Sequence, residues 1–198
     1  MNSFDPKQKR LIETARHLFF RHGIRRISIE EICREADVSK MTFYKHFHDK
    51  GDLIRTILKI LQEEELTRYQ TIIHAENPFP EKVRAMIALR LEQTDSMSRE
   101  FYVDIHKHAD QELIRLLDQM EKDYMNLIEK DFRKARKQGH LRPGIHPEFI
   151  IYLLNKIIEM SHDEALLIMY SSPQAMIMEL TNFFFYGILP AKREDSNS

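Results

Sequence analysis

The chain has 198 residues, of which 42% are hydrophobic and 31% are charged, and its formal net charge is -1. This balance is typical of an ordinary soluble domain, and five glycines with no tryptophan favour helices over sheets, so we predict an all-α protein. A single cysteine, Cys33, excludes an internal disulfide, and no apolar run approaches the length of a membrane span, so we expect a cytoplasmic protein with no membrane partner.

The N-terminal segment predicts a helix that ends near residue 22. Asp5 is a good N-cap, Pro6 suits the first helical position, and Gln8 completes a capping-box spacing. Gly23 is placed to end this helix in a left-handed conformation, as in a Schellman motif.

Residues 27–50 predict two short helices joined by a tight turn. Ser28 can cap the first helix, with a glutamate three residues later that can reach back to the cap. Ser39 can cap the second helix, in which Phe43 and Phe47 lie one turn apart and form a buried face. The other side chains of the second helix are then available to contact nucleic acid.

The charge is distributed unevenly along the chain. Residues 1–60 contain 13 Lys and Arg against 8 Asp and Glu, whereas the remainder contains 17 against 23. A basic N-terminal part is typical of a nucleic-acid-binding head, because phosphate contacts supply most non-specific affinity. The alternative is an uneven surface charge without a function.

The remainder of the chain predicts a helical body. Asp49 can cap a long fourth helix, which two X-Pro steps within residues 77–80 would end. Further helices are expected over about 81–93, 99–108, 110–138, 147–170 and 172–186, which makes about nine in all. The expected domains are 4–64, which binds DNA, and 65–190, which binds a ligand and dimerises, followed by a disordered tail over 191–198.

The chain resembles the TetR family of bacterial transcription regulators at residues 29–32 (IEEI) and 36–47 (ADVSKMTFYKHF), and also at Gly23, Lys50 and Leu53. The resemblance covers about the first 60 residues. It implies a three-helix head containing a helix-turn-helix, joined by a long helix to a C-terminal body that binds a ligand and dimerises. Asp37 stands where the family often has glycine, and Met41 where a small residue is common.

The resemblance implies that the second helix of the pair enters the major groove of DNA. By position, Lys40, Met41, Thr42 and Tyr44 would face the groove or its flanking phosphates, and the alternative for Tyr44 is packing against the first helix. The physical chemistry agrees, because Met41 can touch a thymine methyl and a helix N-terminus at Lys50 suits a phosphate. The expected DNA-binding residues are Ser28, Ser39, Lys40, Met41, Thr42, Tyr44, Lys45, His46 and Lys50.

The last two predicted helices are the most apolar part of the body. The resemblance implies that they form a four-helix bundle between two copies of the chain, so that a homodimer reads a roughly palindromic double-stranded operator. The alternative is that their apolar residues form the core of the monomer. These residues are Ile150, Leu154, Ile157, Ile158, Ala165 and Ile168 on one helix, and Met176, Ile177, Leu180, Phe183, Phe184 and Tyr186 on the other.

Polar residues interrupt the apolar pattern of the body on two helical stripes. One interpretation is that they orient a largely apolar small-molecule effector within a cavity, and the alternative is a solvated face or dimer rim. The candidate pocket residues are Phe101, Asp104, Ile105, His108, Tyr124, Asn155, Glu159 and His162.

Catalytic signatures are missing from the sequence. It has no glycine-rich phosphate loop, nucleophile elbow or metalloprotease pair, so we expect no enzyme activity and no cofactor. Asp104 and His108 provide only two ligands on one face, so we expect no metal site. The predicted function is a homodimeric repressor released by a small-molecule effector. The alternative is a DNA-binding regulator without such an effector, which a partner protein controls through the C-terminal body.

Overall fold

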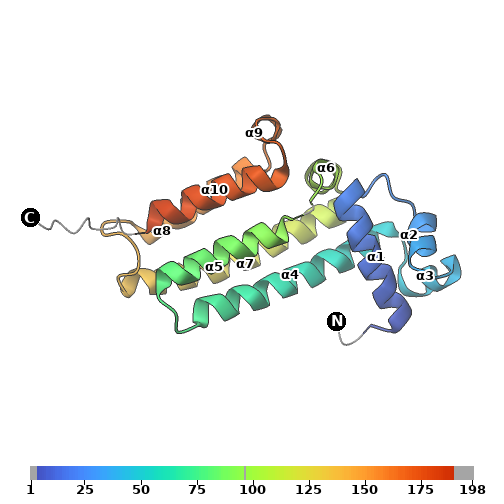
Figure 1. Ribbon diagram of the computed structural model, residues 1–198, viewed down its shortest axis with the longest axis horizontal. Coiled ribbons are helices and arrows are strands. Elements are labelled where there is room, and N and C mark those ends of the chain that lie inside the picture. The colour runs from blue at the N-terminus through green and yellow to red at the C-terminus, as the bar shows by residue number, and fades with distance from the viewer. Residues whose placement is uncertain (1–3, 96, 190–198) are drawn as a thin grey trace, which may run out of the picture. The chain divides into compact units, whose positions relative to one another are not determined.

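The computed structural model describes residues 4–95 and 97–189, and its elements within these ranges are all α-helices (Figure 1). This confirms the all-α prediction. No helix in the described part of the chain is both long and apolar enough to cross a membrane. The helices are α1 (Pro6–His22), α2 (Ile29–Glu35), α3 (Lys40–His46), α4 (Lys50–His74), α5 (Phe79–Gln93), α6 (Arg99–Lys107), α7 (Gln111–Lys137), α8 (Pro147–Ser161), α9 (Glu164–Ile168) and α10 (Pro173–Ile188).

The helices form two compact units. Unit 1 contains the described residues of 4–68 and 95–120, and unit 2 contains those of 69–94 and 121–189, so α4 and α7 each contribute to both. Unit 1 is larger than the DNA-binding domain expected over residues 4–64, because α6 and the start of α7 also belong to it. The tail expected over 191–198 lies outside the described residues.

The predicted helix starts are built from local hydrogen bonds. The side chains of Asp5, Ser28, Ser39 and Asp49 each accept a backbone N–H from two or three residues later, at 2.7 to 3.1 Å. These bonds satisfy donors that the first helical turn leaves without a partner. The four caps predicted from the sequence are therefore confirmed.

The core of unit 1 joins α1, α2, α3 and the start of α4 to α6. Phe19 and Phe43 are fully buried, and Cys33 is buried beside them, which raises the pKa of its thiol. Phe101 of α6 enters the same core and stacks on Phe20 of α1, with 4.4 Å between the ring centroids. The apolar face of α6 therefore serves the core of unit 1.

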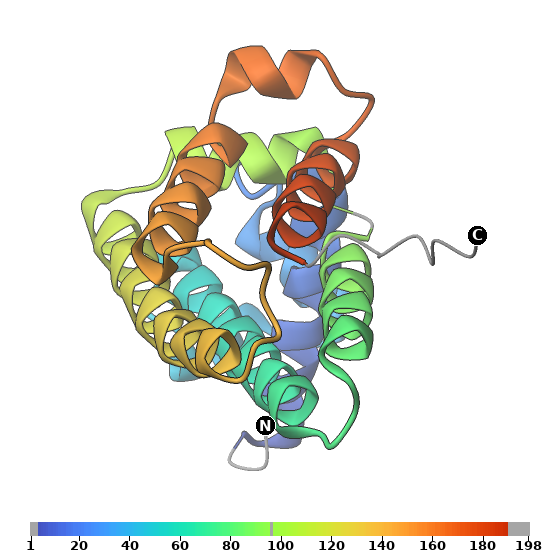
Figure 2. The ribbon, with the colours of Figure 1, turned by 90° about the vertical axis from the view of Figure 1, so that its left-hand side faces the viewer.

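Unit 2 is a bundle of α5, α8, α10 and the later part of α7, seen from its end in Figure 2. Phe132 of α7 meets Phe184 of α10, with ring centroids 5.9 Å apart. Ile150 of α8 and Met176 of α10 are completely buried. These contacts give unit 2 a core of its own.

The helix expected over 147–170 is instead two helices, α8 and α9. Asp163 interrupts the helix because its side chain accepts the N–H of Ala165 at 2.8 Å and so caps a new one. The apolar pattern continues across this break, which is why the pattern indicated one helix. Similarly, α5 begins at Phe79 rather than near residue 81, because Pro80 fits the first turn of a helix.

Candidate nucleic-acid interface

The helix-turn-helix of unit 1 consists of α2 and α3. Phe43 and Phe47 are buried on one side of α3, and their ring centroids are 5.6 Å apart. In the turn before α3, Asp37 has a φ of 51°, in the left-handed region that favours glycine and that Asp tolerates better than most residues. The burial of one face of α3 determines which of its side chains remain accessible.

The opposite face of α3 is open. Met41 is 82% exposed and Tyr44 is 58% exposed, and Lys45 is also exposed. The Tyr44 ring lies edge-on to Phe43, with centroids 5.3 Å apart, although more than half of the Tyr44 residue is exposed. Two large side chains of this kind are suited to contacts with base edges or phosphates.

Other residues expected to bind DNA have partners within unit 1. Lys40 pairs with Glu30, and this contact lowers the pKa of the carboxyl group and raises that of the ammonium group. His46 Nε2 lies 3.0 Å from the Asp5 carboxylate, and only 11% of the His46 side chain is exposed. Thr42 is half-buried.

The cap residues of the two helices also use their hydroxyl groups locally. Ser39 Oγ accepts the N–H of Thr42 and lies 3.0 Å from Thr42 Oγ1, and Ser28 Oγ accepts the N–H of Glu31. Both serines are exposed, so their caps lie at the surface of the helix-turn-helix.

Lys50 does not have the free ammonium group that is expected of a phosphate contact. Its ammonium donates to the backbone carbonyls of Ile24 and Ile27, at 2.9 and 2.8 Å, and burial lowers its pKa, while Asp104 opposes the shift. These bonds hold the loop between α1 and α2. Lys50 therefore stabilises the loop that leads into the helix-turn-helix.

Asp104 holds the same loop from α6. Its Oδ2 accepts the N–H of Arg25 at 2.9 Å. Gly23 lies beside it with a φ of 83° and a ψ of 162°, so the positive φ predicted for this residue is correct but the Schellman geometry is not. The sequence leaves open whether the polar stripe of α6 faces a ligand or lies on a solvated face or dimer rim, and it does not reveal that α6 packs against α1.

The candidate pocket residues are divided equally between the two units. Four of them belong to unit 1, where Phe101 and Ile105 are core residues, Asp104 binds the loop and His108 is exposed at the end of α6. The other four belong to unit 2. There Tyr124 packs edge-on against Tyr69 at 5.9 Å, Asn155 is half-buried, Glu159 pairs with Lys156 at 2.6 Å, and His162 is exposed.

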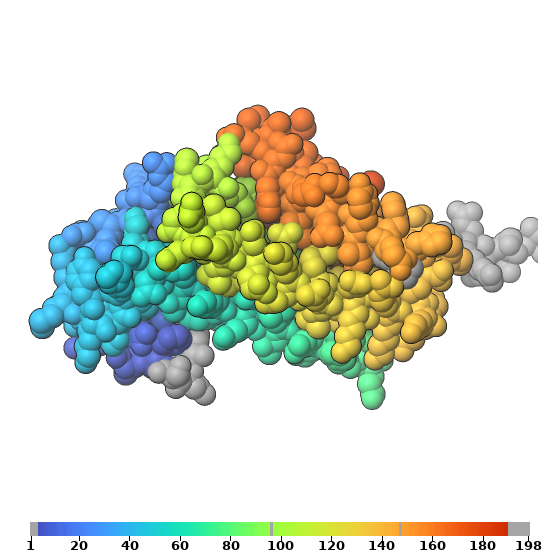
Figure 3. Space-filling view, turned by 180° about the vertical axis from the view of Figure 1, so that it is seen from behind, coloured from blue at the N-terminus to red at the C-terminus, as the bar shows by residue number. Residues whose placement is uncertain are grey.

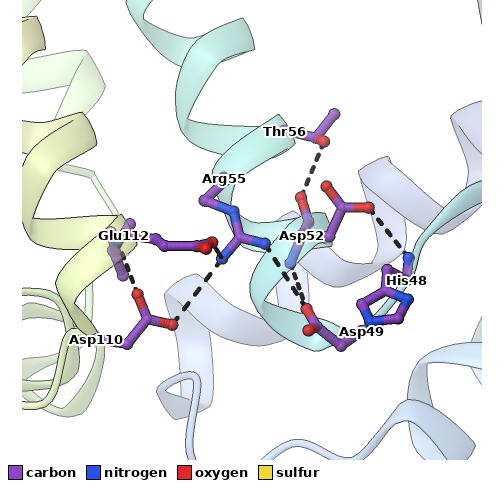
Figure 4. A network of polar contacts seen from close by, with 8 residues as sticks. His48, Asp49, Asp52, Arg55, Thr56, Asp110 and Glu112 are labelled. Carbon is purple, nitrogen blue, oxygen red and sulfur yellow. Dashed lines mark hydrogen bonds and ion pairs between the residues drawn. The ribbon is translucent and has the colours of Figure 1, made fainter.

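Arg55 organises a polar network that the sequence did not indicate (Figure 4). It extends from α4, is 21% exposed, and its guanidinium lies 3.1 Å from Glu112 and 3.9 Å from Asp49 and Asp110. Asp110 in turn accepts the N–H of Leu113 at 2.7 Å and so caps α7. The network fastens the start of α7 to the start of α4 within unit 1. Asp110 and Glu112 lie more than 50 residues after Arg55 in the chain, so no local pattern could reveal these two contacts.

Comparison with known proteins agrees with this geometry. Residues 11–57, which span the helix-turn-helix, match the family described as bacterial regulatory proteins, tetR family. The HTH-type transcriptional regulator UidR of Escherichia coli (strain K12) is 23% identical over 149 residues, which are 75% of this chain and 76% of that protein.

Solved structures share the fold over nearly the whole chain. A transcriptional regulator from Saccharomonospora viridis in complex with choline has a TM-score of 0.71 and 19% identity, covering 92% of this chain and 97% of that one. FadR from Bacillus subtilis in complex with stearoyl-CoA has a TM-score of 0.63 and 15% identity, covering 91% and 98%. Residues 11–57 therefore carry a helix-turn-helix of the tetR family of bacterial regulatory proteins, the relatives include HTH-type transcriptional regulators, and solved transcriptional regulators share the all-helical fold of the chain.

Proposed function

We propose that this regulator is a homodimeric repressor that binds a roughly palindromic operator through α3 and is released by a small-molecule effector. It would act in the cytoplasm, on the nucleoid. The observation that carries the proposal is the two-sided character of α3. Phe43 anchors one face in the core, and Met41 and Tyr44 project from the other. Lys40, Thr42 and Lys45 flank this exposed pair and complete the proposed contact surface with Ser28, Ser39 and His46.

The operator itself provides the first test. Selection from a random double-stranded DNA library is expected to return a two-fold-symmetric site, with half-sites separated by about one helical turn of 10 base pairs or a multiple of it. Affinity for that site should fall steeply between about 50 and 200 mM salt, because lysines and arginines displace counterions from phosphates. An asymmetric selected site would contradict the homodimer. A flat salt response would contradict the phosphate contacts.

Dimerisation through α8 and α10 is supported by apolar side chains that unit 2 leaves in solvent. Phe149, Tyr152 and Met160 on α8 are each at least 46% exposed, and Phe183 and Tyr186 on α10 are 72% and 64% exposed. Large apolar residues left exposed on two helices that pack against each other are typical of an interface. The surface of α8, orange in Figure 3, lies open in that view.

The same two helices also supply the core of unit 2. Ile150, Ile157, Met176, Leu180 and Phe184 are buried within it. Some apolar residues of these helices therefore form the core of the monomer. We propose only the exposed ones for the dimer interface.

Phe183→Glu is expected to convert the dimer into a folded monomer, because it places a charge at the centre of the proposed interface and changes no buried residue. Analytical ultracentrifugation measures the mass, and circular dichroism checks the helical content. Ile114→Glu is the matched control, since Ile114 is 47% exposed on α7 and belongs to unit 1, which supplies no residue of the proposed interface. If both variants remain dimeric, α10 is not the dimer interface.

Control by a small molecule is supported by relatives of the same fold, one in complex with choline and another in complex with stearoyl-CoA. The competing possibility is control by a partner protein. A thermal-shift screen of apolar and cationic compounds distinguishes the two. An effector should give a saturable shift and weaken operator binding, whereas no response from any compound would favour a protein partner.

A further inference from the structure

The exposed face of α3 carries an apolar pair, Met41 and Tyr44. Met41 is 82% exposed, the largest fraction among the large apolar side chains of the described residues, and Tyr44 is 58% exposed. The two residues are three positions apart on one helix, so their side chains lie on the same face. Apolar surface in water does not stabilise the chain, whereas covering it with an apolar group of a partner is favourable.

The polar side chains next to this pair already have partners within unit 1. Lys40 forms an ion pair with Glu30 of α2, and the pair would have to break before the ammonium could donate to a guanine. Thr42 Oγ1 lies 3.0 Å from Ser39 Oγ, which also accepts the N–H of Thr42 at 3.1 Å. Neither Lys40 nor Thr42 is therefore an open donor for a base edge.

Lys45 and His46 lie toward the start of α1. His46 Nε2 is 3.0 Å from the Asp5 carboxylate. The Asp5 pKa is lowered mainly by the N–H group of Gln8, and the charge of Lys45 contributes to the shift, so Lys45 also lies near Asp5. Its ammonium is a compact point charge, which suits a phosphate better than the planar edge of a base.

The sequence of this segment also lacks the side chains that most often pair with bases. Residues 37–48 contain no Arg, Asn or Gln, which bind guanine or adenine through two hydrogen bonds at once. The major groove presents one apolar base group, the C5-methyl of thymine. An apolar pair with no open bidentate donor beside it is suited to that group.

We propose that α3 recognises a thymine in each operator half-site by packing its C5-methyl group against Met41, beside the Tyr44 ring, an inference that rests on the proposed operator binding. Cytosine lacks this methyl group and carries an amino donor at the neighbouring ring position, so it would place a polar group against the apolar pair. The preference for T·A over C·G at this position then arises from the burial of a methyl group.

The test uses the operator that the selection returns, with deoxyuridine in place of each thymine in turn, at the equivalent positions of both half-sites. Deoxyuridine keeps the Watson–Crick hydrogen bonds of thymine and lacks only the C5-methyl group. Fluorescence anisotropy is expected to show one position where the paired replacement weakens binding about 15-fold, since one buried methyl group is worth about fourfold in each half-site. A half-site without thymine, or thymines that all respond by less than about twofold, would overturn the proposal.

Two substitutions assign the methyl contact to Met41. Met41→Gln keeps the length of the side chain but ends it in an amide, so the response to deoxyuridine should fall from about 15-fold to less than about threefold. Met41→Leu remains apolar and should keep most of the response. Circular dichroism checks the fold of both variants. An equal response in the wild type and in Met41→Gln would overturn the assignment, because the deformability of the DNA would then explain it.

Lys45→Ala is the matched control on the same helix. Lys45 is exposed, and its removal should weaken binding to the operator and to random DNA alike, because a phosphate contact is lost. The response to deoxyuridine should remain about 15-fold in this variant. If Lys45→Ala abolishes the response as completely as Met41→Gln does, the response does not report the methyl contact and the proposal is overturned.

Two different results separate loss of the proposed function from loss of methyl recognition. If the selection returns no preferred sequence, the proposed operator binding fails and methyl recognition fails with it. If a symmetric site is returned and bound but none of its thymines responds to deoxyuridine, operator binding stands and methyl recognition alone is overturned.

Discussion

Gly23→Ala is expected to lower the free energy of unfolding by about 3 kcal/mol, because two unfavourable effects add at this position. The first is the backbone, since a φ of 83° with a ψ of 162° is accessible almost only to glycine. The second is steric, since a Cβ on residue 23 would lie 2.9 Å from Asp104 Oδ2 and 2.9 Å from the Cβ of Glu100. Equilibrium urea unfolding at one fixed protein concentration measures the change.

Gly139→Ala provides the matched control. Gly139 also has a positive φ, of 74°, but a Cβ there meets nothing within 4 Å. Only the conformational cost remains, so the expected loss is about 1 kcal/mol. If the two variants are equally unstable, the packing of α6 against residue 23 contributes nothing measurable.

Gly23→Ala should also reduce operator affinity in the fraction that remains folded. The added methyl group displaces Asp104, which accepts the N–H of Arg25 in the loop that leads into α2. The orientation of the helix-turn-helix is fixed partly by that loop. Operator affinity at a temperature where the variant is fully folded separates this effect from instability.

The double substitution Met41→Ala with Tyr44→Ala is expected to weaken binding to the selected operator by about 100-fold, since base contacts are worth about 1 to 3 kcal/mol each. Both side chains are more than half exposed, so the free energy of unfolding should change by less than about 1 kcal/mol. Non-specific DNA binding should persist, because the lysines and arginines that contact phosphates remain. Fluorescence anisotropy with operator and with random DNA measures both affinities.

Leu91→Ala with Ile114→Ala is the control for that pair. These two side chains are each 47% exposed, on α5 and α7, so the control removes exposed apolar surface that belongs neither to α3 nor to the helices proposed for the dimer. Equal operator affinity for the wild type and the α3 variant would refute the assignment of Met41 and Tyr44 to base contacts. Equal loss in both variants would indicate a general defect.

The helix starts and the two faces of α3 could be predicted from the sequence because the forces that determine them are local. Ser39 caps α3 through a residue only three positions later, and Phe43 and Phe47 are four positions apart. The break at Asp163 also has a local cause, but the apolar pattern on both sides favoured a continuous helix. Local signals therefore predicted the elements better than their boundaries.

The partners of the polar side chains in the candidate sites could not be predicted from local patterns. The family resemblance and a place at a helix N-terminus make Lys50 a candidate for a DNA contact, and its polar stripe makes Asp104 a candidate either for an effector contact or for a solvated face or dimer rim. Their observed partners are backbone groups 23 to 79 residues away along the chain. A sequence pattern shows that a side chain is polar, but not which distant group it meets.

By itself, the sequence determined the helical elements, the capped helix-turn-helix and the exposed face of α3, because hydrogen bonds and periodicities over three or four residues set them. Only the tertiary structure decided which charges remain available for a partner. Packing of α6 against α1 commits Asp104 to the loop before α2, and packing of α2 against α3 commits Lys40 to Glu30. The free energy of a polar group depends on its burial and its partners, and long-range contacts determine both.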